Sequence, residues 1–314
     1  MDDKPPFKKT YYYRPGYLLP TICNRNTIDT VNKNFEIRDD DTFVLSYYKS
    51  GTAWVNEMVK AIIHVNDLEY LDCLEFKEKL AVLEMGPVEG PDLVEEGLFY
   101  PKSFIEDFID DAPSPRVVAT HMQPDYVPIQ FFQKKPKTIF VRRNPKDVLV
   151  SLYHWHNTTP FFSPCTWEQL YEEFIKGNTV CGAFWEFYKK WSKYKDEPWM
   201  LWLKFEDIKA NPKQAIKIIA DFIGRPLTEE QLDAVVHATS FQVMKERNER
   251  AVNPDFFLPE EKRNKGYGKT LNLAWQRKGK VGGWKDIFTV AQAEAFDKVY
   301  KEGMKGYEDV MYHF

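Results

Sequence analysis

Residues 42–54, with the sequence TFVLSYYKSGTAW, constrain the fold more than any other segment of the chain. The segment begins with a β-favouring apolar run, Phe43 to Leu45, and continues into a Lys-Ser-Gly-Thr turn. Apolar residues then recur at helical spacing from Trp54 to Ile63. A strand, a glycine-containing turn and a helix N-terminus together present unpaired N–H groups and the positive end of the helix dipole. With the ammonium group of Lys49, this pattern favours binding of a phosphate or sulfate group.

The turn is not a Walker loop, because that loop requires a glycine before the lysine. Here Lys49 precedes Gly51, and the strand itself contains no glycine. Taken alone, the tetrapeptide fits an ordinary strand–helix turn with a solvated lysine equally well.

Length and composition limit the class of protein. The chain has 314 residues, 43% of them hydrophobic, which suits one large α/β domain or two small ones. No apolar run is long enough to cross a membrane, and the N-terminus lacks the apolar stretch of a signal peptide. The four cysteines have no metal or redox spacing, which favours a reducing compartment, the cytoplasm. The net charge of −4 gives no support for nucleic-acid binding, so any anion site must be a local cluster.

Four short apolar segments, 42–47, 116–120, 137–142 and 200–205, are predicted as inner strands. Helical patterns separate or follow them, at 167–176, 183–195 and 212–223. Strands that alternate with helices predict a central parallel sheet with helices on both faces, a three-layer α/β/α fold. Ligands of such folds bind beyond the carboxyl ends of the strands.

The four predicted strands end near Lys49, His121, Arg143 and either Glu206 or Asp207. We therefore expect these side chains to converge on one crevice. No domain boundary is evident, so residues 1–314 are predicted to form a single domain with a flexible N-terminus at 1–10. Two segments rich in Pro, Gly and charge, 87–101 and 246–270, are predicted to be lid-like loops.

Three further clusters could carry chemistry, and each has a structural alternative. Arg143 precedes a helix that contains Ser151, and an arginine there can bind phosphate through two N–H groups. The alternative is a capped helix with exposed charges, with Asp147 serving its first turn. The tripeptide Arg277-Lys278-Gly279 can bring charge and backbone to one anion, or it can be a solvated pair of cations.

The third cluster is the histidine at the end of the second predicted strand. His121 could accept a proton near neutral pH if it faces the crevice, although a lone histidine is more often structural. His154 and His156 lie on different faces of a predicted helix and make a poor metal pair.

Together these segments resemble the cytosolic sulfotransferase family, over about residues 20–294. The family element PKSGTTW is similar to residues 48–54, its RNPKD…S element to 142–151, and its RKGxxGDWK element to 277–285. Shorter stretches at 164–167, 206–212 and 239–244 fit in the same order. The family's dimer motif K-x-x-x-T-V-x-x-x-E is present in full as Lys285, Thr289, Val290 and Glu294.

The resemblance implies transfer of a sulfuryl group from 3′-phosphoadenosine 5′-phosphosulfate (PAPS) to an acceptor hydroxyl or amine. The product of the donor is 3′,5′-adenosine bisphosphate (PAP). The residues implied at the 5′-phosphosulfate are Lys49, Ser50, Gly51, Thr52 and Ala53. Those implied at the 3′-phosphate are Arg143, Ser151, Arg277, Lys278 and Gly279. Those implied at the adenine are Trp54, Phe205 and Phe241, with Thr239 and Met244 nearby.

The catalytic residues that the resemblance implies are His121, Lys49 and Ser151. His121 would take the proton of the acceptor, and Lys49 would neutralise the bridging oxygen as the S–O bond breaks. No metal ion is implied, because cationic side chains and the helix terminus stabilise the charge.

Five positions depart from the family pattern. Tyr48 replaces a proline, Ala53 a threonine, Phe205 a tyrosine and Gly283 an aspartate. Ala119 replaces a lysine two residues before the histidine, where the family's lysine assists at the transferring group. The last change leaves two hypotheses, an active sulfotransferase or a nucleotide-binding relative with weak catalysis. A P-loop kinase or NTPase is a third, disfavoured by the Walker spacing and by the lack of a strand ending in a metal-binding aspartate.

The acceptor is a small molecule that the sequence does not identify. By family analogy its pocket involves residues 18–23, 83–94, 152–162 and 246–265. These segments contain Trp155, Phe161, Phe162, Phe256 and Phe257, which suits an apolar or aromatic acceptor. A phenol, a steroid, a retinoid-like alcohol and an amine all remain open. The dimer motif predicts a homodimer with a small C-terminal interface.

Overall fold

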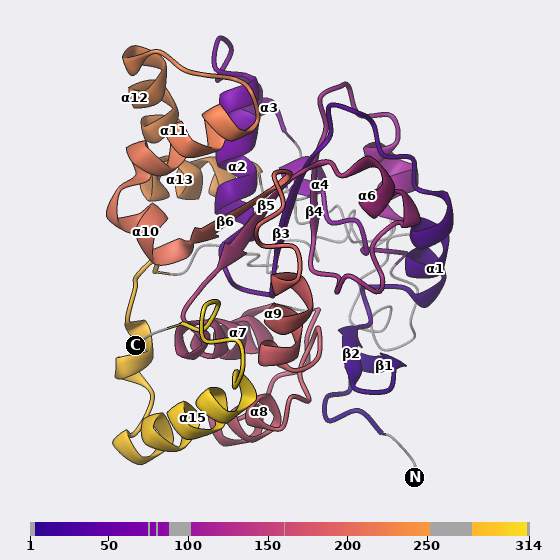
Figure 1. Cartoon of the computed structure of the whole chain (residues 1–314), viewed down its shortest axis with the longest axis vertical. Helices are drawn as coiled ribbons and strands as arrows, with labels where there is room; N and C mark the ends of the chain where they lie inside the picture. The colour runs from indigo at the N-terminus through magenta and orange to yellow at the C-terminus, as the bar shows by residue number, and fades with distance from the viewer. Residues whose placement is uncertain are drawn as a thin grey trace, which may run out of the picture.

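The structure is a computed structural model of the whole chain. It describes residues 4–74, 76–79, 81–87, 102–159, 161–251 and 278–312. The strands are β1 Thr10–Arg14, β2 Tyr17–Pro20, β3 Thr42–Ser46, β4 Val117–Thr120, β5 Lys137–Arg142 and β6 Met200–Lys204 (Figure 1). The helices that position the site are α2 Thr52–Ile63, α7 Pro145–Thr158, α10 Phe205–Ala210, α12 Glu229–Ala238 and α13 Phe241–Ala251. The other helices are α1 Arg25–Asn34, α3 Tyr70–Cys73, α4 Phe76–Lys79, η1 Ile105–Ile109, α6 Ile129–Lys134, α8 Trp167–Ile175, α9 Phe184–Ser192, α11 Pro212–Phe222, η4 Gly283–Asp286 and α15 Val290–Gly303.

Strands β3 to β6 form one parallel sheet in the order β4-β3-β5-β6. The four predicted strands are confirmed to within one or two residues, and so is the three-layer α/β/α class. The one difference at a site position is Phe205, which begins α10 instead of ending β6. Because all four strands run the same way, their carboxyl ends lie along one edge of the sheet.

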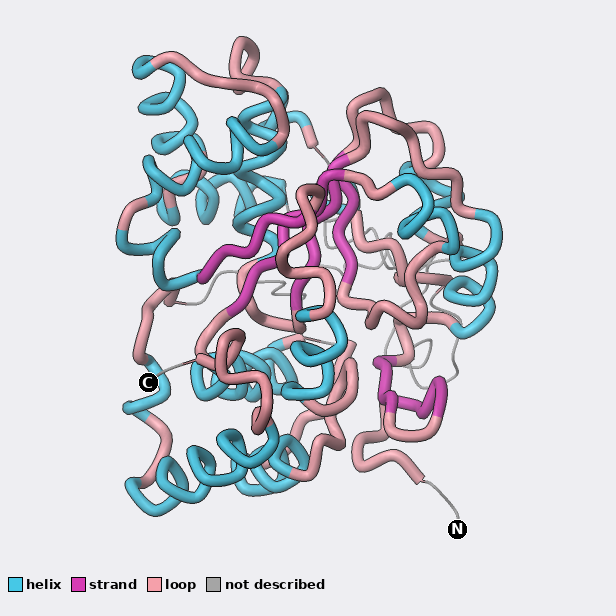
Figure 2. The backbone as a smooth tube through the Cα atoms, viewed as in Figure 1, coloured by secondary structure: helices cyan, strands magenta, loops and turns pink. Residues whose placement is uncertain are grey.

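Alternate residues of the inner strands pack into two apolar cores, one on each face of the sheet, because side chains along a strand alternate between its two faces. Val44 and Ile139 pack with α2, α11 and α12 on one face. Phe43 and Phe140 lie on the other face, where their rings meet Phe131 of α6 and Trp191 of α9. Figure 2 shows the strands at the centre of the molecule with helices on either side. Both faces are therefore covered, which leaves the strand ends for a ligand.

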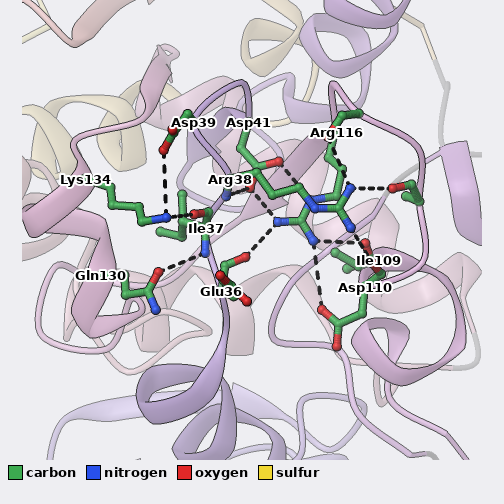
Figure 3. A network of polar contacts seen from close by, with 12 residues as sticks. Glu36, Ile37, Arg38, Asp39, Asp41, Ile109, Asp110, Arg116, Gln130 and Lys134 are labelled. Atoms are coloured by element: carbon green, nitrogen blue, oxygen red, sulfur yellow. Dashed lines mark hydrogen bonds and ion pairs between the residues drawn. The ribbon is translucent and has the colours of Figure 1, made fainter.

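A polar network joins the segments at the amino ends of the strands, away from the expected crevice (Figure 3). The guanidinium group of Arg116 donates to both carboxylate oxygens of Asp41, at 2.8 and 2.6 Å, and both side chains are buried. Arg116 also donates to the carbonyl oxygens of Glu36 and Ile109, and Arg38 donates to the carbonyl oxygens of Asp110 and Ala112. The network fixes the entry to β3 and β4.

The N-terminal part of the chain contains a hairpin that the sequence interpretation did not anticipate. β1 pairs with β2, and Phe7, Tyr13 and Tyr17 are buried in the larger core. The expected flexibility of residues 1–10 therefore does not extend to Phe7, which is packed. The hydroxyl group of Tyr13 bonds the carboxylate of Asp29 in α1, which anchors the hairpin.

The two expected lids fall mostly outside the described residues. Segment 88–101 does so completely, as does 252–270 of the second lid. The first six residues of that second segment, 246–251, were expected to be loop but form the end of α13. All four cysteines are free thiols. Within the described ranges, no helix has the length and apolar character needed to span a membrane.

Candidate active site

The turn between β3 and α2 has the backbone shape of an anion site. Lys49 has φ 65° and Gly51 has φ 112°, so the chain reverses sharply before the helix begins. A Cβ atom on Gly51 would lie 2.7 Å from the ring of Phe205, so only glycine fits. The N–H groups of Trp54 and Val55 both donate to the carbonyl oxygen of Gly51, whereas the first two N–H groups of a helix have no acceptor within it.

A cavity of about 260 Å³ opens at the carboxyl edge of the sheet, next to this turn. It brings together Lys49, His121 and Arg143, which the sequence placed at three different strand ends. The other lining residues are Tyr48, Gly51, Thr52, Ala53, Trp54, Ser151, His154, Trp155, Thr158, Phe205, Lys209, Phe241, Met244, Lys278, Gly279 and Lys280. The predicted convergence of the strand ends is thus found for three of the four ends.

His121 is held in one tautomer. Its Nδ1 lies 2.8 Å from the carbonyl oxygen of Ser46, and a carbonyl can only accept, so Nδ1 carries the proton. The other ring nitrogen, Nε2, then has a free lone pair. Burial lowers the pKa of His121 to about 4, partly offset by the bond to Ser46 and reinforced by Lys49. At neutral pH the imidazole is therefore an uncharged proton acceptor.

The carboxylate of Glu84 supports the strand end that carries His121. Its two oxygens accept from the backbone N–H of His121 at 2.7 Å and from the hydroxyl group of Thr120 at 2.9 Å. Glu84 is fully buried, and this burial raises its pKa to about 7. It thus fixes the position of His121 through the backbone.

The ammonium group of Lys49 lies over the indole ring of Trp155, 3.8 Å from the ring centroid. Trp155 belongs to α7, and its neighbours on the same helical face, Ser151, His154 and Thr158, also line the cavity. The spacing of three and four residues places all four side chains on one side of α7. Helix α7 therefore lines the cavity over two of its turns, alongside Lys49 and Arg143.

A second group of cations lines the cavity next to the turn. Arg143 donates to the carbonyl oxygens of Lys49 and Lys280 at 3.0 and 3.3 Å and lies over the ring of Phe205. Lys278 and Gly279 also line the cavity, and a Cβ atom on Gly279 would lie 2.8 Å from the ring of Phe241. The cavity lining thus combines two cationic side chains with a glycine at which the backbone is accessible.

Asp147 holds this second group in place. Its carboxylate oxygens accept from the backbone N–H groups of Gly282 and Trp284 at 2.7 and 2.9 Å, and the side chain is buried. Asp147 lies in the first turn of α7, as the structural alternative supposed, but its carboxylate also binds the backbone of residues 282–284. It ties α7 to the loop that carries Lys278 and Gly279.

Aromatic rings also line the cavity. The rings of Trp54 and Phe205 meet edge to face at 5.5 Å, and Phe241 and Met244 of α13 also line the cavity. The buried guanidinium group of Arg247 ties α13 to Glu57 of α2. The two helices that carry Trp54 and Phe241 are therefore linked.

Some expected site residues lie outside the cavity lining. Thr239 is buried behind Trp54, and its carbonyl oxygen accepts from the indole N–H at 2.9 Å. Ser50 is buried as well, and its backbone N–H donates to the carbonyl oxygen of Tyr47. Glu206 accepts from the backbone N–H of Asn144 and so supports the Arg143 turn from behind. Arg277 lies outside the described residues.

The expected acceptor segments contribute unevenly. Trp155 lines the cavity, whereas Phe161 and Phe162 are buried in the core next to it. Phe256 and Phe257 lie outside the described residues. His154 and His156 have different surroundings, as predicted. His154 faces the cavity, whereas His156 is buried with its Nδ1 3.0 Å from the carbonyl oxygen of Ser163.

The lining residues Tyr48, Lys209 and Lys280 were not among the site residues inferred from the sequence, whereas His154 and Thr158 fall in the 152–162 segment expected at the acceptor pocket. Helical spacing carried a signal for three of these residues. His154 and Thr158 follow Ser151 at helical spacing, and Lys209 follows Phe205 by one turn. Nothing in the local sequence marked Lys280.

The comparison with family models decides the class of the protein. The model of the sulfotransferase domain matches residues 39–308. The chain belongs to the sulfotransferase family. The resemblance found in the motifs is confirmed, and the protein is a sulfotransferase by family.

Relatives and solved structures agree with this assignment. This sulfotransferase is 34% identical to mouse sulfotransferase 1B1, over 87% of this chain and 86% of the relative. It is 33% identical to human sulfotransferase 1C2, over 91% of both chains. Its fold matches mouse SULT7A1 complexed with PAP, with a TM-score of 0.72 and 24% identity over 96% of both chains. It also matches retinol dehydratase in a complex with retinol and PAP, with a TM-score of 0.75 and 24% identity over 93% of this chain and 88% of the other.

Proposed function

We propose that this sulfotransferase moves the sulfuryl group of PAPS to a hydroxyl group, or an amine, of a small apolar acceptor. The observation that carries the proposal is the cavity at the sheet edge, which is lined by the Lys49 turn, by a second group of cations that contains Arg143 and Lys278, and by the uncharged imidazole of His121. We assign an anion site to each of the two groups of cations. A donor with phosphate groups at two positions would use both.

The described residues fit this donor. The Lys49 turn and the N–H groups of α2 would hold the 5′-phosphosulfate, and Arg143, Ser151 and Lys278 would hold the 3′-phosphate. The rings of Trp54, Phe205 and Phe241 line the same cavity and would flank the adenine. The backbone can approach the nucleotide at Gly51 and Gly279, where a Cβ atom would collide with Phe205 or Phe241. The complexes with PAP among the structural neighbours support this choice of donor.

Each step of the transfer has a candidate group. His121 Nε2 would take the proton from the acceptor hydroxyl as its oxygen forms a bond to sulfur. The bond between sulfur and the 5′-phosphate oxygen would break in line, and its electron pair would stay on that oxygen. Lys49 would neutralise the oxygen, and Ser151 would assist by holding the 3′-phosphate and so keeping the donor aligned. A positioned base contributes about 10²- to 10⁴-fold to such a rate.

The alternative is a relative that binds the nucleotide but catalyses weakly. Ala119 favours it, because this buried residue of β4 brings no charge to the transferring group. The tautomer of His121 and the place of Lys49 favour catalysis. The two hypotheses share the donor site and differ only in turnover.

The test compares the affinity of the protein for PAP and for ADP by isothermal titration calorimetry. The proposal expects clearly tighter binding of PAP, because ADP lacks the 3′-phosphate that Arg143 and Lys278 would hold. Arg143→Met should remove most of this preference. Equal or tighter binding of ADP would refute the donor assignment. A labelled-donor assay with a panel of phenols, alcohols and amines then separates active enzyme from weak relative.

We also propose a homodimer formed through Lys285, Thr289, Val290 and Glu294. Val290 supports this, because its apolar side chain is 77% exposed at the start of α15. Val290→Asp should shift the protein from dimer to monomer in light scattering. The free cysteines favour a reducing compartment, and we infer the cytoplasm.

A further inference from the structure

Tyr48 stands immediately before Lys49, where the motif of the family has a proline. A proline ring closes on its own nitrogen and does not project from the chain. The tyrosine ring projects into the structure and lines the cavity beside Lys49 and His121. The substitution therefore places a large aromatic group near the reacting atoms.

Three contacts fix the ring of Tyr48. It lies against the imidazole of His121 in a tilted arrangement, with centroids 4.1 Å apart and planes at 33°. The ring of Phe162 meets it edge to face at 6.3 Å. Its hydroxyl oxygen lies 3.6 Å from Sγ of Cys23. Only 8% of the residue is exposed, so the ring cannot easily turn aside.

These contacts limit the space around Nε2 of His121. The Nδ1 atom is occupied by the carbonyl oxygen of Ser46, so an acceptor hydroxyl must approach Nε2. The Tyr48 ring covers one face of the same imidazole. An acceptor whose hydroxyl reaches Nε2 must therefore place its carbon skeleton beside a flat, rigid aromatic surface. Aromatic rings pack well there in offset or edge-to-face arrangements.

We propose that Tyr48 is a specificity-determining residue that narrows the acceptor end of the cavity. It admits hydroxyl groups on flat rings and disfavours those on bulky, saturated ring systems. Phe162 and Cys23 hold the ring from behind and keep the passage narrow. The inference rests on the proposed sulfuryl transfer and adds the selectivity of the same site.

The test uses para-nitrophenol and a saturated steroid alcohol as acceptors for Tyr48→Ala, Tyr48→Phe and wild type. For each protein, kcat/KM is measured with PAPS, and acceptor binding to the PAP complex is measured by calorimetry. We expect Tyr48→Ala to raise the steroid-to-phenol ratio about tenfold or more, as changes in pocket shape commonly do. Tyr48→Phe keeps the ring and should stay within about twofold of wild type on the same scale. The calorimetric measurement gives the ratio of the steroid and phenol affinities even if turnover is slow.

Tyr47→Phe is the matched control, because Tyr47 is buried and packs against Phe174, Phe184 and Phe187 instead of His121. Its acceptor ratio should equal that of wild type. If Tyr48→Ala does not melt cooperatively, Tyr48→Leu keeps apolar volume without a flat ring and carries the same expectation. If the steroid-to-phenol ratio is unchanged in folded Tyr48→Ala or Tyr48→Leu protein that still binds PAP, the role of Tyr48 is refuted but the proposed sulfuryl transfer is not. Failure of the wild type to bind PAP overturns the proposed function as well.

Discussion

The ammonium group of Lys49 and the indole ring of Trp155 form a cation–π contact across the cavity, at 3.8 Å from the ring centroid. The contact joins the anion turn to α7. It places the ammonium group at the end of a flexible lysine stem against a ring that lines the cavity. Trp155 thus positions a group that we expect to act on the leaving oxygen.

The first prediction concerns this contact. Trp155→Leu removes the ring and should lower kcat by roughly 2- to 30-fold, the range expected for a cation–π contact of about 0.5–2 kcal/mol. Trp155→Phe keeps a ring and should lose less. Steady-state kinetics at saturating donor would measure both. Equal kcat in the two variants would show that the ring does not position Lys49.

His121 provides a prediction about pH. Its pKa is lowered to about 4 by burial, so the basic, uncharged form dominates from neutral pH down to mildly acidic pH. Acidification through about 4 protonates Nε2 and removes the base, so the loss of kcat/KM assigned to His121 should appear only there. His121→Ala should lower kcat by about 10²- to 10⁴-fold while PAP binding persists.

His156→Ala is a suitable control for the histidine experiment. His156 is also buried, with a pKa lowered to about 4, but it contacts Phe7 and Phe162 instead of the cavity. We expect this variant to lose stability and to keep its kcat. A His121→Ala enzyme with wild-type kcat would remove His121 from the mechanism.

Asp147 leads to a prediction about the donor. Asp147→Ala leaves two backbone N–H groups of the Lys278 loop without their carboxylate, and bonds to charged groups are worth about 1.5–3 kcal/mol. The affinity for PAP should therefore fall by about tenfold or more, whereas ADP, without a 3′-phosphate, should bind nearly as before. Calorimetry with both nucleotides makes this comparison. Equal losses for the two ligands would indicate general damage to the fold.

The Arg116–Asp41 pair gives a prediction about stability. Both side chains are buried, so Arg116→Met leaves an unpaired carboxylate and should lower the free energy of unfolding by about 3–5 kcal/mol. Lys217→Met removes an exposed pair with Asp221 and should cost about 0.5 kcal/mol or less. Urea titrations of the two variants would compare these values. PAP affinity should survive in folded Arg116→Met, since the network lies at the opposite strand ends.

The sequence predicted the sheet and the anion turn well, because both have strong local signals. Apolar runs that end in polar residues marked β3 to β6, and the Lys49 turn marked the start of α2. The hairpin was missed because its stability comes from tertiary contacts, such as Tyr13 with Asp29. Thr239 was expected at the adenine, but its position behind Trp54 depends on how α12 packs, which short motifs do not specify.

One helix, α7, supplies lining residues that we assign to the donor and to the acceptor. Ser151 and Thr158 of α7 are seven residues apart, which corresponds to about 10 Å along a helix. A tilt or shift of α7 would move the donor side and the acceptor side by the same amount. Acceptor selectivity can therefore change through substitution of single side chains on α7. A shift of the helix itself would also displace the residues that we assign to the donor.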